Sequence, residues 1–350
     1  MHYFKLSIMI TLMGGIAAFL WGGFQALSLT LMLSILEISL SFDNAVINAS
    51  VLKKMDRIWQ KRFLTWGIII AVFVIRLILP IFIVAMVANL NFLEVIHLSF
   101  EQPAEYSKHL LDAKVSIASF GGIFLWMVFL SFMLDEHRTL HWLHPVEKFF
   151  KALGKFDTPG RFVPLIALLT LLVFQAMVPE SKRFESLIAG VIGILLFVLL
   201  QSLTYFLNKL KSKLLSSAAR KQKKWGVLSL SGINLGLIQF LYLEILDASF
   251  SLDGVIGAFA ITDDIIIILL GLMIGAVFVR SITIFMVHRG TLDKYMYLEH
   301  GAHYAIGALA VIMFLSIQFE IPEIVIGLIG VIIIGLSLFS SIRHNRRHQP

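Results

Sequence analysis

The chain has 350 residues, of which 58% are hydrophobic and only 15% are charged. A soluble domain carries about 25% charged residues, so this composition excludes an ordinary soluble protein and indicates a membrane protein. There is no cysteine, which excludes disulfides, thiolate metal ligands and thiol catalysis.

Apolar runs of about 17 to 31 residues follow one another along the chain. Each can cross a hydrocarbon core about 30 Å thick, and continuous rather than alternating apolar residues favour helices over a barrel. We therefore predict an all-α fold: a polytopic membrane helical bundle of about ten transmembrane helices, forming a single membrane domain over residues 1–350. The predicted spans are residues 5–22, 26–51, 64–88, 115–134, 162–178, 185–207, 230–260, 265–288, 301–317 and 323–341.

The basic residues between these spans predict the orientation of the chain, because cytoplasmic loops carry an excess of Lys and Arg. Most of the 29 basic residues fall in segments on the same side as the N-terminus, including a basic cytoplasmic loop at 208–225. We expect a multi-pass protein of the cell membrane, with both termini in the cytoplasm and the lipid bilayer as a partner. The net charge of +7 then reflects loops that face anionic lipid and argues against a nucleic-acid partner.

Two of the predicted spans contain the same string of acids and hydroxyls, about 210 residues apart. The first copy, E-x-S-x-S-x-D-N, consists of Glu37, Ser39, Ser41, Asp43 and Asn44. The second copy, D-x-S-x-S-x-D-G, consists of Asp247, Ser249, Ser251, Asp253 and Gly254, with Glu244 as a further acid one turn earlier. Because carboxylates are expensive in a bilayer, two matched sets predict one shared polar site.

The repetition extends to the helices that follow each string. Similar segments carry Arg76 in the first half and Arg280 in the second, which gives two three-helix units at 26–134 and 230–317. The two units start five spans apart, so they cross the membrane in opposite senses and form an inverted repeat. Transporters built this way bind their substrate near the membrane midplane, where the repeats meet.

The chemistry of these residues suits a hard cation. Carboxylate, amide and hydroxyl oxygens are ligands for Mn²⁺, Mg²⁺ or Ca²⁺. The predicted ligands are Glu37, Asp43, Asn44, Glu244, Asp247 and Asp253, and the residues predicted to support or gate the site are Ser39, Ser41, Ser249, Ser251, Arg76 and Arg280. Convergence of Glu37 with Asp43 requires a distorted helix, for which Asn44 and Gly254 are candidate break points. A second interpretation also stands, in which the arginines neutralise the acids for structural reasons alone.

Two groups of histidines lie near predicted cytoplasmic ends. His137, His141 and His144 precede a proline, and His300 and His303 lie at the start of a span. We interpret the first group as part of an interfacial loop in preference to a metal site. We interpret the second group as capping residues in preference to an entrance gate.

The two acidic strings, from Glu37 to Asn44 and from Glu244 to Asp253, resemble the signature segments of the TerC family, named for tellurium resistance, and in particular a branch known only as a domain of unknown function. The resemblance covers residues 28 to 320. It implies an integral membrane protein related to the lysine-exporter superfamily, with Mn²⁺ efflux as an activity of some relatives and with the predicted ligands above as its metal-site residues. Two additional spans between the repeats, and Gly254 in place of a polar residue, depart from the family pattern.

We therefore expect a transporter that exports a divalent cation, with Mn²⁺ favoured over Ca²⁺ or Mg²⁺ and protons as the natural exchanged ion. The sequence has no Walker loop, HExxH helix or GxSxG elbow, so we expect neither an enzyme nor a bound cofactor. Two alternatives remain open: a non-transporting membrane scaffold or assembly factor in a stress response, and an exporter of an amino acid or another small solute.

Overall fold

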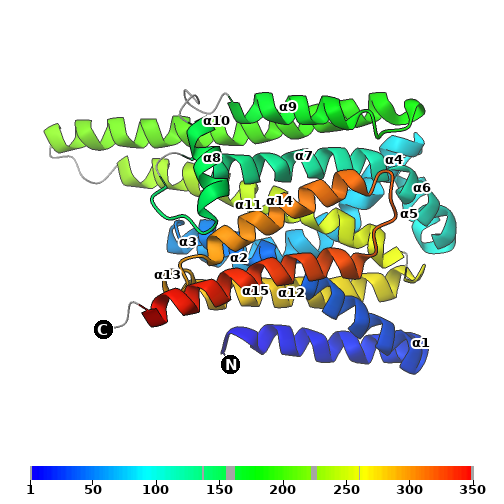
Figure 1. Cartoon of the computed structure of the whole chain (residues 1–350). Coiled ribbons are helices and arrows are strands. Elements are labelled where there is room, and N and C mark those ends of the chain that lie inside the picture. Colours follow the sequence, from blue (N-terminus) through cyan, green and yellow to red (C-terminus); the bar gives the residue numbers. More distant parts are fainter. Residues whose placement is uncertain (1, 136–137, 155–161, 222–226, 260, 348–350) are drawn as a thin grey trace.

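The computed structural model describes residues 2–135, 138–154, 162–221, 227–259 and 261–347, and every regular element in these ranges is a helix. Figure 1 shows that most of the long helices run along one common axis, with α8 lying across it. The α-helices are α1 (Lys5–Leu40), α2 (Phe42–Leu52), α3 (Arg57–Ile69), α4 (Leu79–Ala88), α5 (Phe92–Glu101), α6 (Pro103–Asp112), α7 (Lys114–Met133), α8 (His144–Gly154), α9 (Phe162–Phe174), α10 (Arg183–Lys221), α11 (Val227–Phe259), α12 (Ile265–His288), α13 (Thr291–Lys294), α14 (Leu298–Leu315) and α15 (Glu323–Arg347). A π-helix, η2 (Ile70–Ile78), joins α3 to α4, and the 3₁₀ turns η1 (His2–Phe4) and η4 (Glu180–Lys182) precede α1 and α10.

Within the described ranges, seven helical segments are long and apolar enough to cross a membrane. They are Lys5–Leu40, Arg57–Met86, Lys114–Met133, Glu180–Leu207, Ile265–His288, Leu298–Leu315 and Ile324–Arg347. The predicted all-helical fold is therefore confirmed for the described residues. The apolar helices suggest a membrane protein, and the count of about ten spans stays a prediction. Helix α10 continues to Lys221, so much of the segment 208–225 that we expected as a loop is helical.

Helix α1 turns back on itself at two glycines. Gly22 and Gly23 have non-helical backbone angles, and Gly23 has a φ of 66°, which side chains disfavour. A Cβ placed on Gly15 would lie 3.4 Å from the side chain of Leu27, although twelve residues of unbroken helix would separate them by about 18 Å. The two arms of α1 are therefore antiparallel, and Figure 1 shows the return. The break coincides with the boundary predicted between the first two spans.

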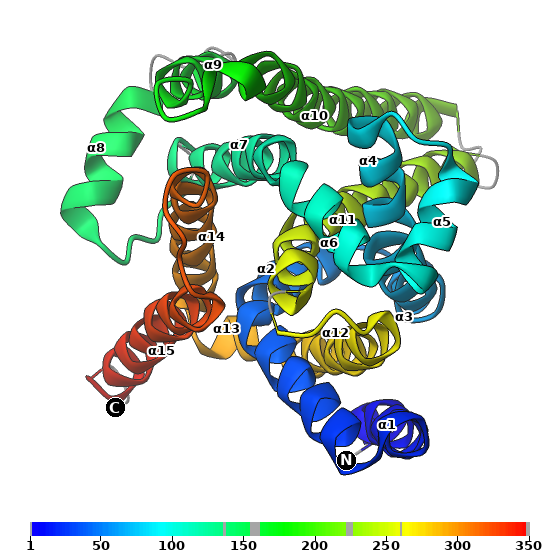
Figure 2. The ribbon, with the colours of Figure 1, turned by 90° about the vertical axis from the view of Figure 1, so that its right-hand side faces the viewer.

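Helix α2 lies in the middle of the bundle. It is separated from α1 by a break at Ser41, where ψ is 15°. Figure 2, a view along the common axis, shows α2 surrounded by α11, α12, α14 and α15. Residues 43–50 are all buried, as expected for a helix with protein on every side. The chain therefore breaks at Ser41 rather than at Asn44, and α11 remains helical through Gly254.

The π-helix η2 has a local cause in the sequence. Pro80 has no N–H to donate, so the carbonyl four residues earlier, that of Arg76, loses its α-helical partner. The turns before it widen to the i to i−5 pattern, as the bond from the Leu79 N–H to the Val74 carbonyl shows. Arg76 lies in this widened segment, and its side chain is buried.

Candidate functional site

Five ionisable side chains from four helical segments form a buried ion-paired cluster. We call it the central cluster. It consists of Glu37 of α1, Arg76 of η2, Glu244 and Asp247 of α11, and Arg280 of α12. The first acid of each string, Glu37 and Asp247, is thus brought together with Glu244 and the two arginines.

Asp247 lies between the two guanidinium groups of the central cluster. Arg280 donates two hydrogen bonds to the two carboxylate oxygens of Glu244, at 3.2 and 3.1 Å, and a third to Asp247 Oδ2 at 3.4 Å. Arg76 donates to Glu37, and its Nη1 lies 3.9 Å from Asp247 Oδ2. A bidentate arginine pair is among the strongest charge-assisted contacts. Each arginine therefore pairs with an acid of its own predicted unit, and Asp247 links the two pairs.

Uncharged groups complete the surroundings of the acids. The Ser41 hydroxyl donates to Glu37 Oε1 at 2.9 Å, and the Asn44 amide donates to Asp247 Oδ1 at 2.6 Å. Arg280 also donates to the Phe63 carbonyl and stacks 4.0 Å above the Phe63 ring. The break at Ser41 places its hydroxyl and the Asn44 amide within reach of acids on two other helices.

Glycines give the charged side chains the room that they occupy. A Cβ on Gly275 would lie 2.4 Å from Glu37 Cγ, and a Cβ on Gly67 would lie 2.5 Å from Arg280 Nη1. A Cβ on Gly254 would lie 3.1 Å from Glu37 Oε2. Gly254, which differs from the polar residue expected from the TerC resemblance, thus has a packing reason in this chain.

The central cluster is incompletely neutralised and incompletely hydrogen bonded. Its three carboxylates face two guanidinium groups, which leaves one excess negative charge when all are ionised. Among the described residues, no hydrogen-bond partner is found for the buried atoms Asn44 Oδ1, Arg76 Nε and Ser251 Oγ, the last of which lies one turn after Asp247 on α11. An unsatisfied buried polar atom costs about 1–3 kcal/mol, so these atoms mark a place where another partner would be accommodated.

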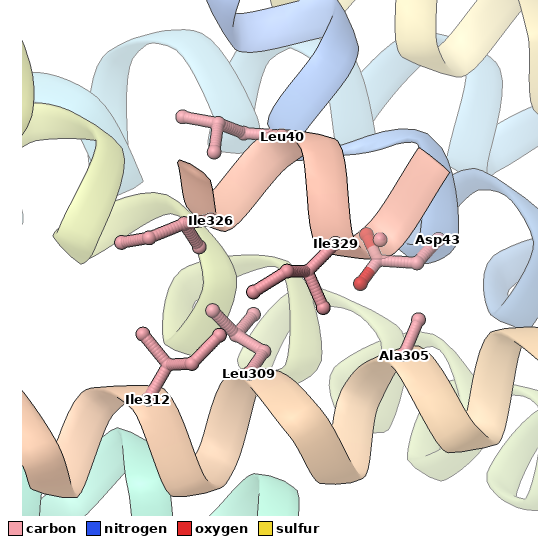
Figure 3. A pocket seen from close by; sticks show the side chains of 8 residues that line it. Leu40, Asp43, Ala305, Leu309, Ile312, Ile326 and Ile329 are labelled. Atoms are coloured by element: carbon pink, nitrogen blue, oxygen red, sulfur yellow. The ribbon is translucent and has the colours of Figure 1, made fainter. Parts of the chain in front are cut away.

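Asp43 lies apart from the central cluster, in a small apolar pocket between α14 and α15. Leu40, Ala305, Leu309, Ile312, Ile326, Ile329 and Gly330 line this pocket with it. Figure 3 shows the carboxylate directed toward Ile329. Its Oδ1 accepts the Asn44 backbone N–H at 2.8 Å, and no ion pair to it is found among the described residues.

The remaining predicted residues have mixed positions. Ser39 is exposed and, like buried Ser249, bonds to a carbonyl of its own helix. The side chain of Asp253 lies outside the part that the structure describes. Among the described side chains, no three acids or histidines are placed to hold a metal ion; in the central cluster, guanidinium groups stand between the carboxylates.

A second buried carboxylate, which the sequence did not single out, belongs to Glu147 of α8. Its Oε1 accepts the backbone N–H groups of Trp142 and Leu143, and its Oε2 accepts Arg138 and His141 at 3.2 and 3.0 Å. We call these five residues the Glu147 cluster. Burial lowers the pKa of the Arg138 guanidinium, and the carboxylate beside it opposes that change. The only sequence signal was the acid in the first turn after Pro145.

The structure also describes the surroundings of His300, His303 and Asn48. His300 Nε2 lies 3.0 Å from the Leu140 carbonyl oxygen, and His303 stacks on Phe132. His137 lies outside the described residues. Asn48, one turn after Asn44, is buried with its Oδ1 unpartnered, and the i to i+4 spacing of the two asparagines was the signal for it.

Comparison with known proteins identifies a family but no characterised relative. A family model described as a protein of unknown function, DUF475, matches residues 42–348. Neither the curated proteins nor the solved structures gave a match. The matched region starts at α2 and includes Asp43, Arg76, Asp247 and Arg280, whereas Glu37 precedes it. Because the match covers most of the 350 residues, the chain belongs to the DUF475 family.

Proposed function

We propose that this protein is a secondary transporter that exports a divalent cation through the central cluster. The observation that carries the proposal is Asp247, which links two arginine–acid pairs in a buried site with an excess of acid. A hard cation would find carboxylate, amide and hydroxyl oxygens there. The unpartnered Asn44 Oδ1 and Ser251 Oγ are oxygens of the same kind.

In this proposal the two arginines are the counter-ions of the unloaded site. Arg76 and Arg280 neutralise acids whose burial would otherwise be costly. A cation that enters from the cytoplasm replaces them, and its release on the other side restores the ion pairs. Arg76 lies in the widened η2 segment, and π-helical turns are frequent at functional sites, so this segment is our candidate for the part that moves.

The inverted repeat predicted from the sequence supports alternating access to this site. Glu37 and Arg76 come from the first predicted unit, whereas Glu244, Asp247 and Arg280 come from the second. A site shared by opposed repeats near the midplane is the arrangement that such transporters use. Asp43, which lies apart in its apolar pocket, is our candidate to carry an exchanged proton.

Mn²⁺ as the cation and efflux as the direction rest on the resemblance to the TerC family. The test uses purified protein in liposomes that contain a Mn²⁺-quenched dye. Wild type should carry Mn²⁺, and Asp247→Asn should lose at least about tenfold of the flux, since it removes the charge that links the two pairs. Asp293→Asn, which alters an exposed acid paired with Lys53, is the matched control and should transport normally. No flux by wild type, or equal flux by the two variants, would overturn the proposal.

The arginines give specific support to a second candidate, the export of an amino acid. A zwitterion needs a cation for its carboxylate and an anion for its ammonium group, and the central cluster contains both within hydrogen-bonding distance. The same liposomes loaded with radiolabelled amino acids test it. Counterflow of an amino acid without Mn²⁺ flux would favour this candidate, whereas absence of both, with stable co-purification of an insertion factor, would favour a scaffold.

The absence of cysteine makes the proposed topology directly testable. We propose a cell-membrane location with ten spans and both termini in the cytoplasm, so Lys108→Cys should react with a membrane-impermeant maleimide in intact cells. Arg289→Cys, on the opposite side, should react only after lysis. The native chain provides an unreactive background, since it has no thiol. Reaction of both positions in intact cells, or of Arg289→Cys alone, would contradict the topology.

A further inference from the structure

A second pocket opens on the outside of the bundle between α3 and α11. Trp59, Arg62, Trp66 and Phe240 line it. It belongs to neither the central cluster nor the Asp43 pocket, and its opening faces outward, because Trp66 is 63% exposed. Helix α3 begins at the end of the bundle that also carries α8 and α13 (Figure 1).

The wall of this pocket is rigidly packed. Trp59 is buried, and its ring lies 5.8 Å from that of Phe240. A Cβ on Gly236 would lie 2.1 Å from the Trp59 ring, so only glycine allows α11 to approach this closely. The Arg62 guanidinium lies over the Trp59 ring, 4.5 Å from its centre, in a cation–π contact that fixes its direction.

Arg62 is a cation without an anion. It is exposed, and no carboxylate pairs with it among the described residues. Arg57 and Lys61 on the same helix are also exposed. The positive charge at this end of α3 is therefore available to a negatively charged ligand.

An apolar stripe leads away from Arg62 along the helix. Trp66, Ile69 and Phe73 follow at helical spacings of four, three and four residues, and they are 63%, 49% and 53% exposed. Eleven residues of helix span about 16 Å, which is comparable with the length of an acyl chain in one leaflet of a core about 30 Å thick. The surface thus joins one cationic end to an apolar track of leaflet length.

We propose that this pocket and stripe bind one anionic phospholipid, with its phosphate on Arg62 and an acyl chain along Trp66, Ile69 and Phe73. Tryptophan at the interface and basic pockets between spans are the features that hold lipid headgroups. A soluble phosphate would use Arg62 alone and would gain nothing from the stripe. The site is independent of the proposed transport.

The test is native mass spectrometry of the purified protein with phosphatidylglycerol and with phosphatidylcholine. Wild type should bind phosphatidylglycerol more tightly, and Arg62→Gln should weaken that binding about tenfold, the equivalent of about 1.4 kcal/mol. Arg57→Gln, an exposed basic residue of the same helix outside the pocket lining, is the matched control and should bind normally. Trp66→Ala should weaken binding of either lipid, whereas Phe19→Ala, on exposed surface of α1, should not.

Several results would overturn the proposal. Equal phosphatidylglycerol binding by Arg62→Gln and Arg57→Gln would show only general charge attraction. Displacement of the lipid by glycerol 3-phosphate at the same concentration would assign the pocket to a soluble anion instead. Thermal unfolding of each variant is measured alongside, and Arg62→Lys, which keeps the charge, should recover part of the binding and separates charge loss from misfolding.

Discussion

The central cluster and the Glu147 cluster bury carboxylates in different ways. Glu147 bonds to two backbone N–H groups four and five residues before it and to side chains six and nine residues before it. The acids of the central cluster instead accept the arginines from 33 to 39 positions away, and Asp247 accepts Asn44 from 203 positions away. Ser41, four residues after Glu37, is a nearer partner. Most partners of Glu147 belong to one segment, and Tyr304 of α14 donates one further hydrogen bond at 3.4 Å. The central cluster instead exists only when four helical segments pack.

The two sites also differ in which of their buried atoms lack a hydrogen-bond partner among the described residues. In the Glu147 cluster both carboxylate oxygens are used, and the unpartnered atoms are the donors Arg138 Nε and Nη1. At the central cluster they include the oxygen of Asn44, which bonds to Asp247 through its amide N–H, and on α11, one turn after Asp247, the oxygen of Ser251. A locally satisfied acid is suited to fixing one conformation, and an incompletely satisfied set of oxygens is suited to exchanging partners. This difference is why we place stability at Glu147 and function at Asp247.

The largest expected effect is on stability at Glu147. Glu147→Ala leaves Arg138 and two backbone N–H groups without their acceptor, so we expect a loss of about 3–5 kcal/mol in the free energy of unfolding. Denaturant unfolding in mild detergent, followed by tryptophan fluorescence, measures it. Glu180→Ala, whose side chain is 88% exposed, should change the value by less than about 0.5 kcal/mol. A Glu147→Ala loss below about 1 kcal/mol would remove the contrast between the two sites.

The next effect tests pairing within the central cluster. Arg280→Gln leaves Glu244 without its bidentate partner, and Glu244→Gln leaves Arg280 without its acceptor. The double variant places two neutral amides there. We expect a coupling free energy of about 2 to 3 kcal/mol from this double-mutant cycle, since the two residues share one network. The same unfolding experiment gives it. Additive losses would mean that the pair is not formed in the membrane protein as purified.

The sequence predicted the composition of the central cluster better than its geometry. The paired strings and arginines identified Glu37, Glu244, Asp247, Arg76 and Arg280, because charges in apolar spans are rare and need partners. The structure shows ion pairs between the arginines and the acids, and the interpretation that these pairs serve assembly alone stays untested. The string could not reveal that Asp43 leaves the group, because this depends on the turn at Ser41, where no glycine or proline marks a break.

The fold, like the central cluster, was predictable from the sequence only in part. The boundary predicted between spans 5–22 and 26–51 coincides with the reversal of α1 at Gly22 and Gly23, because two adjacent glycines weaken a helix and permit a positive φ. The π-helix η2 was not predicted, although Pro80 lies within the predicted span 64–88 and removes a helical hydrogen bond. The Glu147 cluster could not be predicted from the sequence, because two partners of Glu147 are backbone N–H groups, which every residue except proline possesses.

A smaller effect sharpens the comparison through packing. Gly275→Ala would push against Glu37, because the added Cβ would lie 2.4 Å from Glu37 Cγ. We expect a loss of about 1 to 2 kcal/mol from overpacking, together with reduced transport. Gly335→Ala in α15, where nothing lies within 4 Å of the added carbon, is the matched control and should stabilise by up to about 1 kcal/mol through helix propensity. Equal effects at both positions would show that Glu37 moves freely.

The smallest expected effect concerns the exposed pair between Lys53 and Asp293. Their side chains are 42% and 65% exposed, so water and salt screen the attraction, and such pairs contribute less than about 1 kcal/mol. Asp293→Asn should therefore change the free energy of unfolding by no more than about 0.5 kcal/mol, in the same denaturant experiment. A larger loss would mean that an exposed acid also contributes substantially to the free energy of unfolding of this protein. Asp293→Asn could then no longer serve as the transport control, and the contrast with Asp247 would have to be tested at another exposed acid, such as Glu101.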